Sequence, residues 1–309
     1  MAEKYGYGKP DKKYGARPDK KSDRKFDKKS DKRFAGKHDS SDKRYGAYGK
    51  GRAKPEKDEA RNENEELANG SVPGRNAVRE LLKSGRDIEK IFVREGDREG
   101  SITVLVAQAI ERGIPVIEVD RKKLDALCGY EQHQGIVAIA SEKEYVTLEE
   151  VIAIAEEKGE KPLIVICDGV SDPHNLGAII RCAEGAGAHG IVLPKRRAAG
   201  ITPAVVKASA GATEHLAAVK CSNISDMIRK LKDLGFWIFA AEADGTDYTA
   251  ADYNCPCALV LGSEENGVSD IVKKNSDFTV SIPMKGQVNS LNVSTAAAVL
   301  LYEVIRQRG

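Results

Sequence analysis

Short polar side chains, among them Ser290 and Asn292, follow a predicted strand near the end of the chain. That strand ends at Pro283, and a run dense in Ala, Leu and Val at helical spacing starts at Val293. The loop therefore lies between a buried strand and a buried helix, whose free N–H groups can hold a ligand oxygen. Asn and Ser are also preferred N-cap residues, so Asn292 or Ser294 could simply cap the helix.

A second polar loop follows the apolar run at residues 162–168, which is typical of a central parallel strand. Asn175 lies at the start of the helical segment that continues through 178–186, and Arg181 lies about one turn further along. Because the rest of this helix is apolar, Arg181 must reach an anion or the surface. Both side chains are therefore candidates for contact with a ligand.

A third polar loop follows the apolar run at 257–261 and reads Gly-Ser-Glu-Glu-Asn-Gly before a predicted helix. Its glycines, of which Gly262 is the first, allow a ligand to approach the backbone, and Glu264 and Glu265 supply carboxylates. The alternative is an ordinary acidic helix start, which the helix dipole favours. In open parallel sheets ligands bind beyond the carboxyl ends of the strands, so we expect the three loops to meet in one crevice.

The cysteines do not predict a metal site. Cys255 and Cys257 flank a single residue, Pro256, whereas zinc and thioredoxin pairs have two residues between the cysteines, and no His lies close. All six cysteines are scattered through apolar segments, as reduced cytosolic thiols are. We interpret them as core thiols.

A parallel sheet that could hold these loops is predicted over residues 161–309. Strands and helices alternate there, which indicates the α/β class. Between the second and third loops we expect strands at 191–193, 216–219 and 237–241, and helices at 203–210 and 224–234.

A smaller α/β domain is predicted at residues 71–141, and a charged, helix-prone linker follows it at 142–160. In the smaller domain we expect helices at 76–83, 102–112 and 121–127, and strands at 88–93, 114–119 and 135–140. Its possible contact points are Gly74-Arg75-Asn76 and the turn that contains His133. No second acid or nucleophile lies near His133, so we favour a loop hydrogen bond or an RNA contact over catalysis.

The segment Gly-Ala-Gly-Ala-His-Gly at 185–190 matches the pattern of a dinucleotide fingerprint. A true fingerprint runs from a strand into a helix, so that the helix N-terminus meets the pyrophosphate. Here the order is reversed, because the segment follows a helix and precedes a strand. We interpret these glycines as a helix end, which disfavours a nucleotide-dependent oxidoreductase.

The N-terminal tail, residues 1–70, differs in composition from the rest of the chain. It holds 21 Lys and Arg against 14 Asp and Glu, and it repeats units such as Asp-Lys-Lys between Tyr and Phe residues. With no Leu, Ile or Val before Leu67, it cannot bury a core and should be disordered. Cations and aromatic rings suit a loose nucleic-acid tether, although a solvating linker is the alternative. No signal or membrane-spanning run is found, so we expect a cytoplasmic protein.

The three loops also carry a family resemblance. The motifs DPHNLGAIIRCAEGAG, LVLGSEENGVS and IPMKGQVNSLNVSTAAAVLLYE resemble, in order and spacing, the signature motifs of the SpoU (TrmH-type) RNA ribose 2′-O-methyltransferases. The likeness covers about residues 160–308. Residues 72–141, with GRNAV and HQGIVA, are similar to the L30e-like substrate-binding domain of the bacterial 23S rRNA guanosine-2′-O-methyltransferase subgroup.

The resemblance implies a SPOUT fold with a C-terminal trefoil knot, a homodimer, and S-adenosyl-L-methionine bound in the knot. It also implies the roles of individual residues. The cofactor would be held, largely through backbone, by Gly262, Ile282 and Leu291. The catalytic set would be Asn175, Arg181, Glu264, Ser290 and Asn292. No metal is implied, because moving a methyl group to a ribose 2′-OH needs positioning and the removal of one proton.

The role of Arg181 is open, because a guanidinium is almost always protonated and so is a poor proton acceptor. Positioning of phosphate or ribose, and stabilisation of the developing alkoxide, are physically easier roles for it. The predicted partner is RNA, most specifically 23S rRNA. The alternatives are methylation of tRNA, methylation of rRNA that confers antibiotic resistance, and a non-catalytic role in RNA binding or ribosome assembly.

Overall fold

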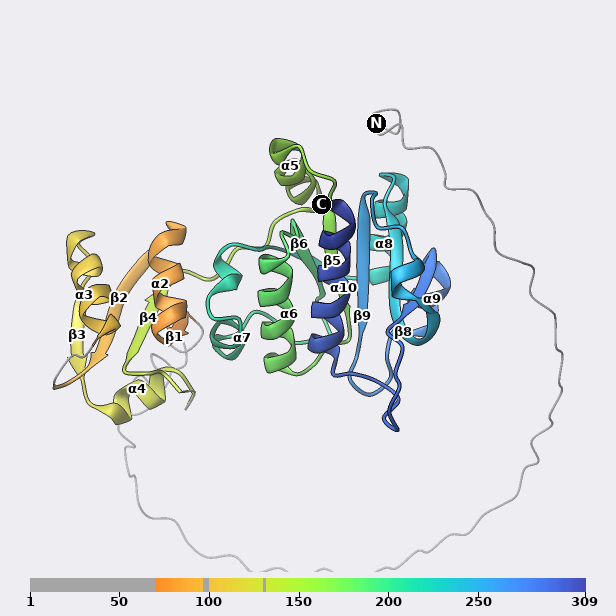
Figure 1. Ribbon diagram of the computed structural model, residues 1–309. Coiled ribbons are helices and arrows are strands. Elements are labelled where there is room, and N and C mark those ends of the chain that lie inside the picture. Colours follow the sequence, from red (N-terminus) through yellow and green to blue (C-terminus); the bar gives the residue numbers. More distant parts are fainter. Residues whose placement is uncertain (1–69, 97–99, 130–131) are drawn as a thin grey trace, which may run out of the picture.

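The computed structural model describes residues 70–96, 100–129 and 132–309. Figure 1 shows them as two α/β units, each built on its own sheet. The disordered basic tail predicted at 1–70 lies, apart from Gly70, outside the described residues. None of the helices in the described part combines the length and the apolar character needed to cross a bilayer.

The N-terminal unit is a four-stranded sheet with the strand order β1-β4-β2-β3. Helices α2 and α3 pack on one face of this sheet, and α4 packs on the other. The elements are β1 (Ser71–Pro73), α2 (Arg75–Ser84), β2 (Ile88–Arg94), α3 (Ser101–Glu111), β3 (Val116–Val119), α4 (Arg121–Leu127) and β4 (Ile136–Ala140). All the helices and strands expected here are present, and the short β1, which pairs antiparallel with β4, was not predicted.

The C-terminal unit is a six-stranded parallel sheet with the strand order β10-β8-β9-β5-β6-β7. Its strands are β5 (Leu163–Asp168), β6 (Gly190–Pro194), β7 (Ala217–Cys221), β8 (Trp237–Asp247), β9 (Cys257–Gly262) and β10 (Phe278–Ser281). Its helices are α5 (Leu148–Lys158), α6 (Pro173–Gly185), α7 (Pro203–Ala208), α8 (Ile224–Asp233), α9 (Asp270–Asn275) and α10 (Val293–Arg308), with short 3-10 turns η2 (Ala212–Glu214) and η3 (Tyr248–Ala250). The predicted parallel α/β sheet is confirmed.

Both faces of this sheet are covered, which explains why its central strands are apolar throughout. Along β5, Val165 and Cys167 point to the layer formed by α6, α7 and α10. Ile164 and Ile166 point to the opposite layer, formed by α5, α8 and α9. Because successive side chains of a strand point to opposite faces of the sheet, β5 contributes to both cores.

Helix α5 forms most of the segment at 142–160, which was expected to be helix-prone, and it joins the core of the C-terminal unit. Thr147 and Glu150 form a capping box at its start, and the helix then buries Leu148, Val151 and Ala155. Val151 is fully buried in the same core as Ile164. The many glutamates of this segment lie on the outer face and obscured the narrow apolar stripe of a surface helix.

The reversed glycine motif ends a helix, as predicted. Helix α6 finishes at Gly185, and Gly187 adopts a left-handed φ of 67° two residues later. The N–H of Ala188 then donates to the carbonyl of Ala183, and β6 begins at Gly190. The dinucleotide interpretation is thereby excluded for this segment, because no helix N-terminus follows it.

Candidate active site

A cavity of about 560 Å³ lies at the carboxyl ends of β9 and β10, beside the middle of β8. Apolar side chains such as Leu261, Ile282 and Leu300 form part of its wall. Six of the eight residues predicted for the site also line it: Gly262, Glu264, Ile282, Ser290, Leu291 and Asn292. The third and the C-terminal polar loops therefore do meet in one crevice, and its volume is within the range of small-molecule sites.

Asn175 joins the remaining loop to this cavity through its side-chain amide. Its Nδ2 donates to Oε1 of Glu264 at 2.9 Å, and its Oδ1 accepts from Nδ2 of Asn292, also at 2.9 Å. The side chain is 9% exposed, so both of these hydrogen bonds lie in a largely desolvated place. Asn175 thus connects the loops that follow β5, β9 and β10.

Asn292 both caps a helix and takes part in this network. Its Oδ1 accepts hydrogen bonds from the backbone N–H and the hydroxyl of Ser294, at 2.8 and 2.6 Å, which caps α10. Its Nδ2 is then directed to Asn175. Capping, one of the two interpretations that the sequence left open, is therefore confirmed, and the same side chain lines the cavity.

Glu264 is an ionised acceptor at the centre of the network. Burial alone would raise the pKa of Glu264, but the hydrogen bond from Asn175 and those from backbone N–H groups lower it below its ordinary value overall. The N–H groups of Ser171 and Asp172 each lie 3.4 Å from its carboxylate. The start of α6 thus holds a negative charge beside the cavity. The helix that follows the Glu264 loop, α9, has Asp270 rather than Glu264 in its first turn.

The loop after β9 is too tight for any side chain at its first glycine. A Cβ on Gly262 would lie 2.0 Å from the carbonyl carbon of Gly267 and 2.1 Å from the nitrogen of Val268. Ser263 and Gly267 exchange two backbone hydrogen bonds of 3.0 Å across the turn. Gly262 is therefore required by the close approach of its own loop, a reason that the sequence did not reveal.

Two carboxylates outside the predicted set hold this loop in place. Oδ2 of Asp168, at the end of β5, accepts from the N–H and the hydroxyl of Ser269 at 2.8 and 2.6 Å. Glu242 accepts from the N–H of Val268 at 2.5 Å and also lines the cavity. Glu242 was missed because β8 continues to Asp247, beyond the predicted end at 241, through residues that are mostly polar.

Arg181 is the predicted site residue that the structure does not bring to the cavity. It is exposed on α6 and is absent from the residues that line the cavity described here. Six positions separate it from the buried Asn175, so the two side chains leave the helix on different faces. Ser290 is exposed at the cavity wall.

A basic loop after β6 was not singled out from the sequence. Lys195, Arg196 and Arg197 are all exposed there, and the carbonyl of Arg197 lies against Gly169, beside the loop that carries Asn175. The signal was available, because this is another polar loop directly after a predicted strand. Three cations at the edge that carries the cavity favour a polyanionic partner.

His133 serves its own loop, as favoured from the sequence. Its Nδ1 accepts from the N–H of Gly135 at 3.0 Å, and its Nε2 lies 3.2 Å from Asp125. Burial lowers the pKa of His133 even though Asp125 opposes the shift. Within the described residues, no group of three or more His, Cys, Asp or Glu side chains could hold a metal ion.

The cavity therefore combines apolar walls, backbone groups of a tight turn, side-chain amides, hydroxyls and carboxylates. Such a set can bind an organic ligand and orient a second one against it, and the carboxylates favour a cationic ligand. It suits group transfer that depends on positioning.

Two family models match the chain. The model of the SpoU rRNA Methylase family matches residues 162–302, and a model described as RNA 2′-O ribose methyltransferase substrate binding matches residues 71–146. Among curated proteins, the chain is 44% identical over 238 residues to a putative TrmH family tRNA/rRNA methyltransferase, YacO, of Bacillus subtilis. That alignment covers 77% of this chain and 95% of the relative.

Solved structures give a consistent picture. The chain is similar to the SpoU methyltransferase AviRb from Streptomyces viridochromogenes in complex with AdoMet, with a TM-score of 0.66 and 25% identity, over 80% of this chain and 93% of that one. It is also similar to an AdoMet-bound rRNA methyltransferase from Sinorhizobium meliloti, with a TM-score of 0.64 and 26% identity, over 80% and 90% of the two chains.

Proposed function

Because the chain belongs to the SpoU rRNA Methylase family, we propose that it transfers a methyl group from S-adenosylmethionine to a ribose 2′-hydroxyl of RNA. We propose a guanosine of 23S rRNA as the target and the cytoplasm as the place of action. The observation that carries the proposal is the side chain of Asn175, which joins three polar loops at one cavity.

The cavity fits S-adenosylmethionine in size and in chemistry. Its volume is sufficient for a nucleoside with a side chain, and Leu261, Ile282 and Leu291 offer apolar surface. The backbone of the tight turn at Gly262 is held close to this space by Ser263 and Gly267. Glu264 and Glu265 complement a positive sulfonium. When bound, S-adenosylmethionine supplies an electrophilic methyl group.

The protein contributes positioning and control of one proton. Asn175 and Asn292 fix the geometry of the cavity wall, and the ionised Glu264 orients Asn175. Ser290, exposed at the wall, can donate to or accept from the ribose. Arg181 would stabilise the alkoxide that forms as the 2′-hydroxyl loses its proton, or would hold the neighbouring phosphate.

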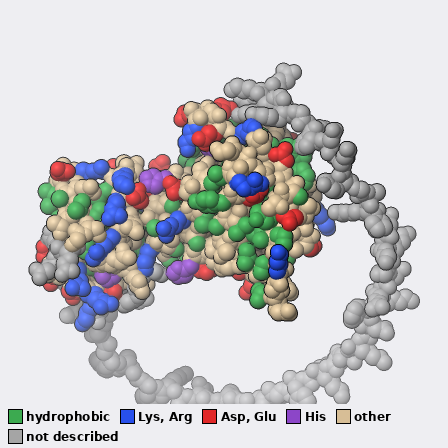
Figure 2. Space-filling view, in the orientation of Figure 1, with side chains coloured by type: hydrophobic (Ala, Val, Ile, Leu, Met, Phe, Trp, Pro, Cys, Tyr) green, Lys and Arg blue, Asp and Glu red, His purple; other side chains and the backbone are tan. Residues whose placement is uncertain are grey.

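A homodimer explains the position of Arg181. Helices α6 and α10 pack side by side. Tyr302 on α10 is 56% exposed, and Figure 2 shows hydrophobic side chains over these helices. A two-fold dimer that buries this surface would direct Arg181 of one protomer to the cavity of its partner. The trefoil knot and the L30e-like character of the N-terminal unit remain predictions.

RNA is supported as the partner by the distribution of charge. Lys and Arg side chains are spread over the visible face of the N-terminal unit (Figure 2). Lys195, Arg196 and Arg197 extend this charge to the edge that carries the cavity. Such a surface neutralises phosphates along an extended strand.

The test is transfer of tritium from labelled S-adenosylmethionine to unmodified 23S rRNA fragments and to unmodified tRNA, with Arg181→Ala alongside. Label in rRNA ribose that disappears in the variant supports the proposal. Label in tRNA alone supports RNA methylation and rejects 23S rRNA as the substrate. No label in either RNA, with the protein folded, rejects the enzyme and favours an assembly factor.

A further inference from the structure

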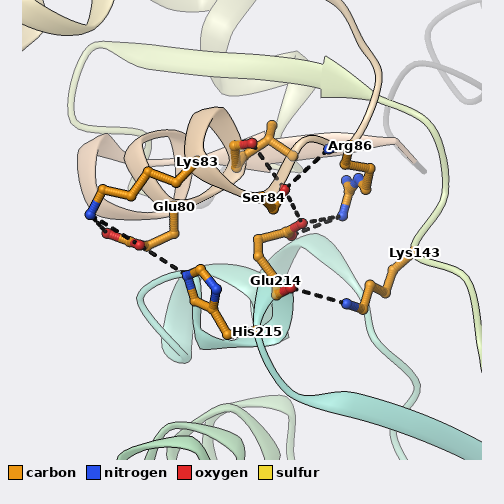
Figure 3. Close-up of polar contacts among 8 residues, drawn as sticks. Glu80, Lys83, Ser84, Arg86, Lys143, Glu214 and His215 are labelled. Atoms are coloured by element: carbon orange, nitrogen blue, oxygen red, sulfur yellow. Dashed lines mark hydrogen bonds and ion pairs between the residues drawn. The ribbon is translucent and has the colours of Figure 1, made fainter. Parts of the chain in front are cut away.

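The two units are joined by a buried ion pair. Arg86 follows α2 in the N-terminal unit, and its Nη1 lies 2.8 and 3.1 Å from the two carboxylate oxygens of Glu214 in η2 (Figure 3). The side chain of Glu214 is 1% exposed and that of Arg86 is 15% exposed. Ser84 adds a hydroxyl 3.4 Å from the same carboxylate. We call these three residues, with their contacts, the clamp.

Further polar contacts surround the clamp. Nε2 of His215 lies 3.0 Å from Glu80, which also pairs with Lys83 on α2 (Figure 3). Nζ of Lys143 donates to the backbone carbonyl of Glu214 at 3.4 Å. Burial lowers the pKa of Lys143, although Glu214 opposes the shift, which agrees with a desolvated junction. Charges from three separate segments therefore meet at η2.

Apolar contacts close the same junction. Val206 of α7 is 5% exposed and belongs to the core of the N-terminal unit, together with Val72 and Val78. A Cβ on Gly211 would lie 2.8 Å from Cβ of Glu80, and the φ of Gly211 is +92°. Only glycine permits this approach without strain. The connection between β6 and β7 thus packs into the N-terminal unit.

The opposite side of that connection packs against the helix that carries Asn175. A Cβ on Gly177 of α6 would lie 2.4 Å from Cβ of Ala208 and 2.9 Å from the nitrogen of Ser209. Asn175 is only two residues away on α6. One segment, α7 with η2, is therefore wedged between the N-terminal unit and the helix that carries the site.

The covalent link between the units is held as well. Nζ of Lys220 lies 4.0 Å from the ring centroid of Tyr145, and the N–H of Ile201 donates to the Tyr145 hydroxyl at 3.3 Å. The N–H of Val146 donates to Ala218 at 2.9 Å. The link is thus packed along its length, so the junction does not depend on the clamp alone.

We propose that Arg86 and Glu214 are positioning residues, which dock the N-terminal unit on α7 and η2 and so hold RNA bound there in register with Asn175 and the cavity. This rests on the proposed function, in which RNA contacts both units. A buried ion pair gives little net stability, but it favours one arrangement of its surroundings. When the two units are docked before RNA binds, fewer degrees of freedom of the protein are lost on binding.

The test variant is Arg86→Glu, which places a second carboxylate opposite Glu214 at the junction, so that the two repel each other and favour undocking. The restoring variant is Arg86→Glu with Glu214→Arg, which returns opposite charges to the same two places. Lys232→Glu is the control, because it breaks the 2.8 Å pair of Lys232 with Asp277 inside the C-terminal unit. Each full-length protein is measured for amide hydrogen exchange, for S-adenosylmethionine affinity, and for affinity and KM toward a 23S rRNA fragment.

We expect Arg86→Glu to speed amide exchange at residues 75–86 and 201–216. It should weaken RNA binding and raise KM about tenfold, whereas kcat and S-adenosylmethionine affinity should stay within about twofold of the wild-type values. The charge reversal should restore both exchange and RNA affinity. Faster exchange with unchanged RNA affinity would overturn the proposal, and so would unchanged exchange in Arg86→Glu. An equal loss of RNA affinity in Lys232→Glu would also overturn it. Exchange and RNA affinity need no catalysis, so an inactive wild type would reject the proposed function and still leave the clamp tested.

Discussion

The side-chain amide of Asn292 donates a 2.9 Å hydrogen bond to the side-chain oxygen of Asn175, which lies 117 residues earlier in the chain. Asn175 in turn donates to Glu264, so one directed series of hydrogen bonds connects three loops. Asn175, the middle member, makes both of these hydrogen bonds only if the other two loops are in place. The geometry of the cavity wall is therefore a property of the whole network.

Replacing Asn175 with Ala should abolish most methyl transfer. The change leaves Glu264 without its closest side-chain donor and Asn292 without its acceptor, which should reduce kcat about 100-fold and cost about 1–3 kcal/mol of unfolding free energy. Single-turnover methylation and denaturant unfolding measure the two effects. Asn223→Ala, which removes the cap of α8, is the control: it should lose stability and retain activity. Equal activity in the two variants would contradict the role of the network.

Gly262→Ala should prevent cofactor binding, because the new methyl group would overlap Gly267 and Val268. Displacing this loop should cost about 1–3 kcal/mol and distort the cavity wall. Gly286→Ala is the matched control, since its Cβ would have no other atom within 4 Å. Calorimetric titration with S-adenosylmethionine should show binding in the control and none in Gly262→Ala. Normal binding in both would show that the loop adapts and that the tight turn is dispensable.

Arg181→Ala should retain S-adenosylmethionine affinity and lose methyl transfer, because Arg181 lies away from the cavity of its own protomer. Co-expression with Asn175→Ala distinguishes the possible arrangements. If Arg181 acts on the partner's cavity, a heterodimer of the two variants has one intact site and should recover about half of the wild-type rate. If it acts on its own cavity, no site is intact and no activity returns. Tandem-tag purification of the heterodimer and a tritium assay decide between them.

Stability should fall as the pH drops below about 6.5, in part through His189. Nδ1 of His189 accepts from the N–H of Leu163, and Nε2 faces Glu160, so the neutral ring fits the fold. Burial lowers the pKa of His189 from 6.5, although Glu160 opposes the shift. The unfolded chain therefore takes up a proton first as the pH falls, which lowers the free energy of unfolding by up to about 1.4 kcal/mol per pH unit.

His189→Gln should remove this component, whereas replacement of the exposed His174 should not. Urea unfolding at pH 7.5 and 5.5 gives the difference for each protein. The same loss of stability in wild type and His189→Gln would assign the pH dependence to other groups.

Deletion of residues 1–69 tests whether the basic tail is a nucleic-acid tether. A tether predicts that RNA affinity falls about tenfold at low salt and that its dependence on salt becomes shallower. Affinity for S-adenosylmethionine should not change. Identical RNA binding with and without the tail would favour the solvating-linker interpretation.

Sequence patterns were enough to predict the order of the strands and helices and the three polar loops at strand ends. These follow from local properties: the apolar run at 257–261 marks a strand, and Gly262 marks the turn after it. The features that were missed have weak local signals. The narrow apolar stripe of α5 among glutamates hid its packing in the core, and β8 continues through mostly polar residues up to Asp247.

How these parts meet could not be predicted from the sequence and is seen only in the folded chain. It placed Asn175 between Glu264 and Asn292, directed Arg181 away from the cavity, and joined Arg86 to Glu214 across the two units. Each relationship connects segments far apart in the chain or depends on which face of a helix is buried. Periodicity reports which residues are buried, but not against which partner, because many pairings bury the same surface equally well.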